Sequence, residues 1–215
     1  MAEVLIAVRG GQDAKSRSLI EPRHRAGLVE AMLTDMLQAI GRAPSVTAVH
    51  VVTPTPEIAI LAAALGAAAL LERGGEGLNA AFSFAREPIA SRAPNATLVV
   101  LPGDLPGLDP AELEAVIAQR DEGSMVLVPA ARDGGTGALA LRADVNFPFA
   151  YGPASFERHL ALARALGLEP RVMAQPSLAD DLDRPADLRA WLAAGRRGAT
   201  ATLLAGLDLA TEAVA

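Results

Sequence analysis

The sequence predicts an α/β fold, a three-layer domain in which helices cover both faces of a mostly parallel mixed β-sheet. In the first half of the chain, short and almost continuously apolar segments alternate with stretches whose apolar residues recur at helical spacing. Of the 215 residues, 51% are hydrophobic and only 3% are aromatic, so alanine, leucine and valine must fill the core. No change in composition marks a linker, and we expect residues 1–215 to form a single domain.

The first half is expected to contain four strands and three helices. The strands are the apolar segments 3–8, 47–52, 67–71 and 97–101. The helices are the segments 23–40, 56–65 and 78–87. Pro56 suits the first turn of its helix, whereas Pro88 is expected to end the third helix. The apolar run 58–71 is shorter than the roughly 20 residues of a bilayer span, and we interpret it as a buried helix followed by a buried strand.

The second half departs from this alternation. Two strands, 125–129 and 138–141, are joined by the glycine-rich loop 132–137. Further along, the pattern predicts a helix, a strand, an acidic loop and a second helix, at 153–166, 171–174, 180–183 and 185–192. The alanine-rich tail, 195–215, is expected to be helical.

Composition excludes several classes of function. The chain has no cysteine, which excludes thiol catalysis, zinc–thiolate sites and iron–sulfur clusters. The net charge of −6 argues against nucleic acid or a membrane surface as a partner. The N-terminus has no signal-peptide pattern, so a cytoplasmic protein is expected. His24, His50 and His159 share no ligand spacing, and each is expected to be a structural or surface residue.

The loop after the first strand is a candidate phosphate-binding segment. It begins with a glycine pair and carries three cations, which are Arg9, Lys15 and Arg17. Freed backbone amides and these cations could hold a triphosphate, and a solvated loop with ordinary charges explains the same residues equally well. Neither GxGxxG nor GxxxxGKS/T is present in this loop, so the Rossmann and P-loop interpretations lose their main support.

Three aspartates form a candidate metal site. Asp104 follows the strand 97–101, at the end of a parallel sheet where ligands usually bind. Asp181 and Asp183 are two residues apart, which places both carboxylates on one side of an extended segment. Taken singly, Asp104 could be a turn residue and Asp183 could cap the helix at 185–192. Taken together, the three favour a magnesium site that serves a nucleotide substrate.

Six short motifs carry a resemblance to a known family. They are AKSR at 14–17, GLN at 77–79, GDLP at 103–106, GGT at 134–136, YGPASF at 151–156 and DLDRPADL at 181–188. In this order the motifs resemble the 2-phospho-L-lactate guanylyltransferase family, from the first strand to about Trp191. The early motifs occur in many nucleotidyltransferases, so the later three are the specific part of the resemblance.

The resemblance implies a nucleotidyltransferase-like fold, as in nucleotide-diphospho-sugar transferases, and transfer of GMP from GTP to a phosphorylated three-carbon acid. Family members use 2-phospho-L-lactate, phosphoenolpyruvate or 3-phospho-D-glycerate, in coenzyme F-420 biosynthesis. A homodimer and hand-off of the product to a deazaflavin acceptor transferase are further implied. The implied residues are Asp104, Asp181 and Asp183 for Mg²⁺; Lys15 and Asp104 for catalysis; Arg9, Gly10, Arg17, Gly77 and Asn79 for the nucleotide; and Thr136, Gly152 and Ser155 for the phospho-acid.

Two positions depart from the family pattern. Arg9 stands where the family has a lysine, which keeps the charge and changes its geometry. Gly137 stands where the family has the asparagine that follows GGT, and we expect the missing polar contact to alter acceptor preference. Two alternatives stay open, a molybdopterin-type or other nucleotidyltransferase and a non-catalytic nucleotide-binding regulator. The three aspartates argue against the regulator.

Overall fold

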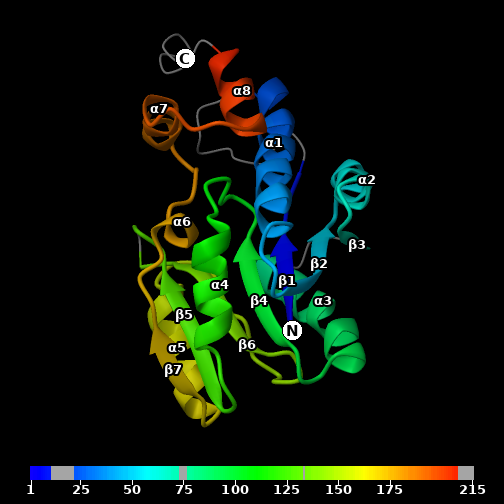
Figure 1. The fold of residues 1–215 in the computed structure, drawn as a ribbon, viewed down its shortest axis with the longest axis vertical. Coiled ribbons are helices and arrows are strands. Elements are labelled where there is room, and N and C mark those ends of the chain that lie inside the picture. Colours follow the sequence, from blue (N-terminus) through cyan, green and yellow to red (C-terminus); the bar gives the residue numbers. More distant parts are fainter. Residues whose placement is uncertain (11–21, 73–76, 133, 208–215) are drawn as a thin grey trace.

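The computed structural model of the chain describes residues 1–10, 22–72, 77–132 and 134–207. These residues contain a seven-stranded sheet in the order β3-β2-β1-β4-β6-β5-β7 (Figure 1). The strands are β1 (Ala2–Ala7), β2 (Val46–Thr53), β3 (Ala68–Leu71), β4 (Thr97–Pro102), β5 (Ser124–Pro129), β6 (Thr136–Arg142) and β7 (Glu169–Val172). β6 runs antiparallel to β4 and β5, and the other neighbouring pairs are parallel. The expected mostly parallel mixed sheet is therefore confirmed.

Helices pack on both faces of this sheet. Side chains of α1 (Pro22–Ile40), α2 (Pro56–Ala64), α4 (Pro110–Gln119), α6 (Pro176–Ala179), α7 (Pro185–Ala193) and α8 (Ala199–Ala205) join one core cluster. Those of α3 (Leu78–Arg92) and α5 (Ser155–Ala165) join the other. Successive residues of β1 alternate between the clusters, with Val4 and Ile6 in the first and Leu5 and Ala7 in the second. This alternation is the period-two geometry of a strand buried on both faces.

The third helix does not end at Pro88, so that prediction is wrong. α3 continues to Arg92 with Pro88 inside it. A proline here removes the hydrogen bond to the carbonyl of Phe84. Both residues lie on the exposed side of the helix, where water can satisfy that carbonyl. Ile89 is buried in the core and holds the turn that follows the proline.

The apolar run 58–71 is not a buried helix and a buried strand. In α2 only Ile58 and Ala62 are buried, and Ile60 is 71% exposed. β3 is an edge strand that pairs with β2, and Leu71 is 55% exposed. The run is apolar along its length, but its place at the edge of the sheet leaves most of it uncovered. Two short helices, α4 and α6, were not expected from the sequence.

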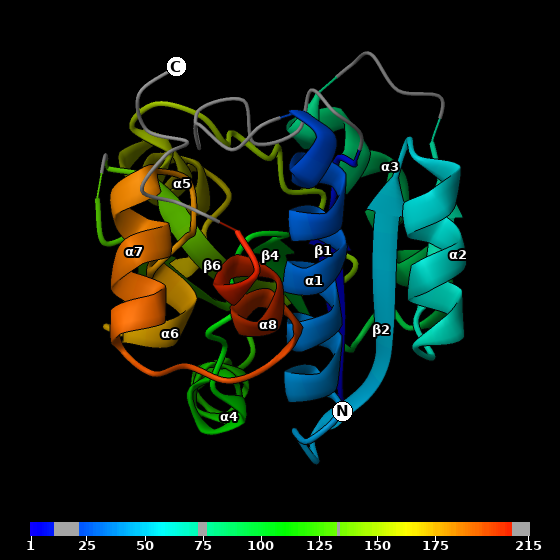
Figure 2. The same cartoon turned by 90° about the horizontal axis from the view of Figure 1, so that it is seen from above.

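The described part of the C-terminal tail contains one helix, α8, and residues 208–215 lie outside the described residues. α8 lies beside α1 (Figures 1 and 2). Asp35 of α1 makes this contact: its Oδ1 accepts from the amide of Ala199 at 2.8 Å and its Oδ2 from that of Thr200 at 2.9 Å. The side chain thus binds the first amides of a helix far along the chain. Within the described ranges, no helix combines the length and apolar character that a bilayer crossing requires.

Candidate active site

The candidate site lies where the strand order of the sheet reverses. β2 and β3 lie on one side of β1, and β4 lies on the other, so the segments that follow β1 and β4 meet at one edge. Gly103, after β4, packs closely against the end of β1. A Cβ atom at Gly103 would lie 2.7 Å from Cγ2 of Val8 and 2.8 Å from the carbonyl oxygen of Ala7. Glycine therefore allows this turn to carry Asp104 next to β1.

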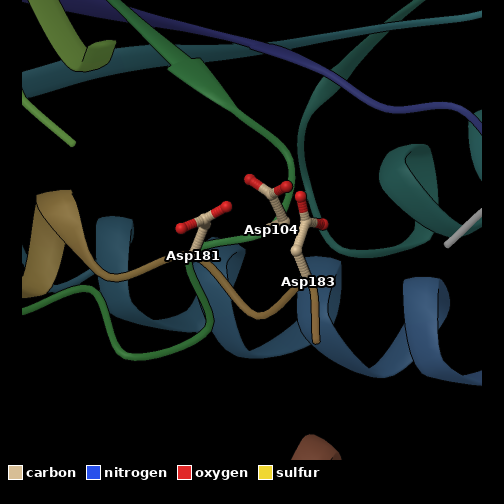
Figure 3. A group of neighbouring side chains, drawn as sticks. All are labelled: Asp104, Asp181 and Asp183. Atoms are coloured by element: carbon tan, nitrogen blue, oxygen red, sulfur yellow. The ribbon is translucent and has the colours of Figure 1, made fainter. Parts of the chain in front are cut away.

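Three carboxylates converge at this edge (Figure 3). Asp104, Asp181 and Asp183 each offer one oxygen, and these oxygens lie within 4.8 Å of one another. All three residues are half-buried. The side chain of Leu182 is buried in the core, and its amide donates to the carbonyl of Asp104 at 3.1 Å. The inward leucine therefore turns both neighbouring aspartates toward Asp104, as the spacing of two predicts.

Asp187 and Arg132 support this acidic loop. Oδ2 of Asp187 accepts from the amide of Asp183 at 3.2 Å and from that of Arg184 at 2.8 Å. Its Oδ1 pairs with the guanidinium of Arg132, which also donates to the carbonyl of Asp181 at 3.0 Å. Burial opposes the charge of Arg132, but the nearby carboxylates, Asp187 first, outweigh it and raise the pKa of that guanidinium. These contacts hold the segment mainly through its backbone, and Arg132 also lies 3.6 Å from Oδ1 of Asp181. The carboxylate of Asp183 points at the cluster.

These contacts exclude the helix-capping role that the sequence left open for Asp183. Asp183 does not cap α7, because the N-cap residue is Arg184 and the capping carboxylate belongs to Asp187. The supporting role of Asp187 was not expected from the sequence, although an acidic residue three positions after the N-cap is a recognisable capping signal. The role of Arg132 was not expected either, and the local sequence has no signal for it, because its partners lie on a distant loop.

A second polar group combines residues of β6 and α5. Oγ of Ser155 lies 3.2 Å from Oγ1 of Thr136, and the amide of Ser155 donates to the carbonyl of Gly152 at 3.1 Å. The structure therefore brings together the three residues expected to hold the phospho-acid. Gly152 has a φ of 124°, a backbone conformation that favours glycine.

His159 completes this group and was not expected to take part in it. The ring is fully buried, with Nδ1 2.8 Å from Oγ1 of Thr136 and Nε2 accepting from the amide of Ala150 at 2.9 Å. Burial, together with the charge of Arg158, lowers the pKa of His159 to about 4. The ring is therefore neutral at pH 7. The sequence does hold a signal for this contact, because His159 follows Ser155 by four residues on one helix and side chains at that spacing are neighbours.

Comparison with known proteins assigns the chain to a family. The family model described as "Guanylyl transferase CofC like" matches residues 2–213. The chain belongs to this CofC-like family. It is 48% identical to a 3-phospho-D-glycerate guanylyltransferase of Phenylobacterium zucineum (strain HLK1), over 87% of this chain and 88% of that one. It is 39% identical to a phosphoenolpyruvate guanylyltransferase of Sphaerobacter thermophilus, over 86% and 89% of the two chains.

Solved structures confirm the fold. A crystal structure from Desulfovibrio desulfuricans G20, described as a nucleotide-diphospho-sugar transferase, superposes with a TM-score of 0.79 at 19% identity and covers 99% of each chain. A nucleotidyl transferase from Methanothermobacter has a TM-score of 0.66 at 17% identity, covering 88% of this chain and 95% of that one. The nucleotidyltransferase-like fold that the resemblance implied is therefore the fold of this family member.

The residues expected to bind the nucleotide are described only in part. Lys15 and Arg17 lie outside the described residues. Arg9 is exposed after β1. The amide of Gly10 donates to Oγ1 of Thr55 at 3.2 Å.

The remaining two nucleotide-binding candidates lie at the start of α3. Gly77 is the N-cap residue of that helix, with a φ of 85°. Asn79 makes a reciprocal contact with the backbone of Tyr151: its Nδ2 donates to the carbonyl at 3.1 Å, and its Oδ1 accepts from the amide at 2.7 Å. Asn79 thus connects the turn expected to bind the nucleotide with the segment expected to bind the phospho-acid.

Gly137, where this chain departs from the family pattern, is tightly enclosed. A Cβ atom there would lie 2.0 Å from the carbonyl oxygen of Leu178 and 3.1 Å from Cα of Ala179. The backbone of α6 occupies the space that a side chain would need. An asparagine therefore cannot be added at Gly137 without moving α6. The expected effect of this position on acceptor preference stays a prediction.

Proposed function

We propose that this family member transfers GMP from GTP to a phosphorylated three-carbon acid, with release of pyrophosphate, in coenzyme F-420 biosynthesis. The observation that carries the proposal is the convergence of Asp104, Asp181 and Asp183 at the switch point of the sheet in a CofC-like chain. Acidic side chains repel phosphates, so their clustering at a nucleotide site is explained by a cation between them.

The chemistry of the donor set fits magnesium. Mg²⁺ prefers carboxylate oxygens, water and substrate phosphates, and it is held by few protein ligands. The residues that would hold it are Asp104, Asp181 and Asp183. When bound, the ion would neutralise charge on the α-phosphate and on the leaving pyrophosphate. Arg132 and Asp187 would fix the acidic loop in the orientation that this task needs.

The remaining residues position two anions. Arg9, Gly10, Gly77 and Asn79, with Lys15 and Arg17, are proposed to hold GTP; Thr136, Gly152 and Ser155 are proposed to hold the phospho-acid. A phosphate oxygen of the acid attacks the α-phosphorus of GTP, a new P–O bond forms, and the bond to pyrophosphate breaks. The attacking oxygen is already ionised, so no general base is required. The rate enhancement then comes from alignment and charge neutralisation. In this arrangement Lys15 and Asp104 act as catalytic residues.

The proposal extends to the acceptor and to partners. The relative at 48% identity is named for 3-phospho-D-glycerate and the relative at 39% for phosphoenolpyruvate, so we place 3-phospho-D-glycerate first among the acceptors. We further propose that the reaction takes place in the cytoplasm and that the product is handed to a deazaflavin acceptor transferase. A homodimer is also proposed, supported by the apolar exposed residues Ile60 and Leu71 beside the β3 edge.

Pyrophosphate release with GTP, Mg²⁺ and each of the three phospho-acids tests the function. We expect turnover with at least one acid, and loss of turnover when GTP is replaced by CTP or when EDTA is added. A chain that binds GTP without releasing pyrophosphate from any acid would be a regulator. Turnover with CTP and a pterin substrate would instead identify a molybdopterin-type enzyme.

A further inference from the structure

We propose that His159 is a positioning residue that makes the Thr136–Ser155 pair a hydrogen-bond donor toward an anionic oxygen of the acceptor. The inference rests on the proposed function, in which these hydroxyls meet the phospho-acid. All three side chains are almost fully buried: His159 is 0% exposed, Ser155 1% and Thr136 6%.

The direction of the hydrogen bonds follows from the backbone. The amide of Ala150 donates to Nε2 of His159 at 2.9 Å, so Nε2 carries no hydrogen. A neutral imidazole has one hydrogen, which must then be on Nδ1. Nδ1 lies 2.8 Å from Oγ1 of Thr136, and this oxygen is therefore the acceptor. A backbone amide thus selects the tautomer of the ring.

Counting hydrogens shows what this tautomer does. The group has three hydrogens, one on Nδ1 of His159 and one on each hydroxyl of Thr136 and Ser155. The hydrogen on Nδ1 of His159 is donated to Oγ1 of Thr136. One of the two hydroxyl hydrogens is used in the 3.2 Å hydrogen bond between Thr136 and Ser155. Among the described residues, no acceptor is found for the third hydrogen. The group therefore presents one hydroxyl donor to a ligand.

The opposite tautomer of His159 would leave no hydroxyl donor for a ligand. With the hydrogen on Nε2, that atom would face the amide of Ala150 as a second donor. Thr136 would then donate to Nδ1 and Ser155 to Thr136, which uses both hydroxyl hydrogens. Only lone pairs would face the ligand, and they would repel a carboxylate or a phosphate. The tautomer of His159 thus decides whether the pair attracts or repels an anion.

At the start of α5, the first two backbone amides are not available to a ligand. The amide of Ser155 is used by the carbonyl of Gly152, and the amide of Phe156 donates to the carbonyl of Gly134 at 3.1 Å. The first two amides of the helix are therefore committed to loop carbonyls. The helix terminus still favours negative charge, and a side-chain hydroxyl supplies the directed hydrogen bond that these two amides do not.

The first test measures the tautomer directly. The chain has only three histidines, and long-range ¹H–¹⁵N correlation spectra of the labelled protein distinguish the two tautomers and the imidazolium. The His159 signals are assigned by their loss in His159→Asn. We expect the Nδ1–H tautomer at pH 7. An Nε2–H tautomer or an imidazolium would overturn the inference, and this readout needs no substrate.

The second test separates positioning from general structure. In His159→Leu we expect the KM for the acceptor to rise on the order of 10- to 100-fold, the cost of one hydrogen bond to a charged group, while the KM for GTP stays within about twofold. His159→Asn, whose amide can replace the Nδ1 donor, should recover much of this loss. Thr136→Val removes the hydroxyl itself and should reproduce the Leu effect if His159→Leu does not fold. The matched control is His50→Asn, a buried histidine bonded to Glu3 near the start of β1, which should change neither KM.

The outcomes separate the inference from the function on which it rests. An unchanged acceptor KM in folded His159→Leu, or in Thr136→Val, would overturn the role of His159. An equal rise in both KM values would mean a structural role and would also overturn it. If the unaltered protein releases no pyrophosphate with any of the three acids, the proposed function fails, while the tautomer still decides the donor direction of the pair.

Discussion

The carboxylate of Asp187 binds the backbone of Asp183, a metal-site candidate four residues earlier in the chain. Its Oδ2 accepts from the amides of Asp183 and Arg184 at 3.2 and 2.8 Å, while Oδ1 pairs with Arg132. Asp187 is buried and does not belong to the carboxylate cluster. It therefore acts on the site through the position of its neighbour.

We expect Asp187→Asn to weaken magnesium activation more than the fold. The amide side chain loses the charge that pairs with Arg132 and one of the two acceptor oxygens. Changes to groups that hold metal ligands typically reduce metal affinity or activity by about 10- to 100-fold. A magnesium titration of pyrophosphate release should show half-activation shifted upward by that factor. Asp144→Asn, which breaks the Arg142–Asp144 ion pair at the end of β6, is the control, and an equal shift there would remove the role of Asp187.

Asp104→Asn and Asp183→Asn should each reduce transfer on the order of 100-fold or more, since each removes one charge from the ion's ligand set. Both residues are half-buried at the rim of the sheet, so circular dichroism and the urea midpoint should stay close to those of the unaltered protein. Rates are measured at limiting magnesium. Near-normal turnover of either variant under these conditions would contradict its assignment as a ligand.

Gly137→Ala should destabilise the protein by roughly 1–3 kcal/mol, the usual cost of overpacking a filled interior. The new Cβ would lie 2.0 Å from the carbonyl oxygen of Leu178, so α6 must move, and the segment that leads to Asp181 must move with it. Urea unfolding measures the first effect and the magnesium titration the second. Gly41→Ala is the control, because a Cβ there lies 3.4 Å from its nearest neighbour. Equal stability of the two variants would show that α6 adapts without cost.

The pH dependence of stability should report the buried neutral state of His159. Its folded pKa of about 4 is below the unfolded value near 6.5, so the unfolded chain binds the extra proton first as pH falls. Stability is therefore lost below about pH 6.5, by roughly 1.5 kcal/mol between pH 6.5 and 5. The difference in unfolding free energy between the unaltered protein and His159→Asn isolates this contribution. A difference that stays constant over that range would mean that the ring is not held neutral by the fold.

Lys15 is the only lysine of the chain, which makes it a selective chemical probe. If its ammonium contacts phosphate, GTP with Mg²⁺ should slow its acylation, while labelling of the terminal amine stays unchanged as an internal control. Loss of one such preorganised donor typically costs about 100- to 1,000-fold in rate, so Lys15→Ala should lose activity to that extent. Peptide mass spectrometry measures the protection. Labelling that ignores GTP, together with an active Lys15→Ala variant, would indicate a solvated loop lysine.

Much of the fold follows from local pattern. The apolar segments and helical periodicity predict most strands and helices, because burial on one face or two leaves a repeat in contiguous residues. The Asp181–Asp183 spacing predicts two carboxylates on one side because alternate residues of an extended segment share a side. The ordered motifs predict the family, which the match over residues 2–213 confirms.

Other features depend on contacts between distant segments. Pro88 is tolerated because the tertiary fold leaves its side of α3 exposed and buries Ile89. The run 58–71 is apolar throughout, yet only its place at the sheet edge decides that Leu71 is exposed.

The same holds within the candidate site. The amide of Ala150 selects the tautomer of His159, and the backbone of Leu178 fills the space beside Gly137. A sequence determines which residue types stand at which spacing. Only the packed structure decides which backbone group meets which side chain, because hydrogen bonding and exclusion of volume act over a few ångströms between segments that periodicity does not relate.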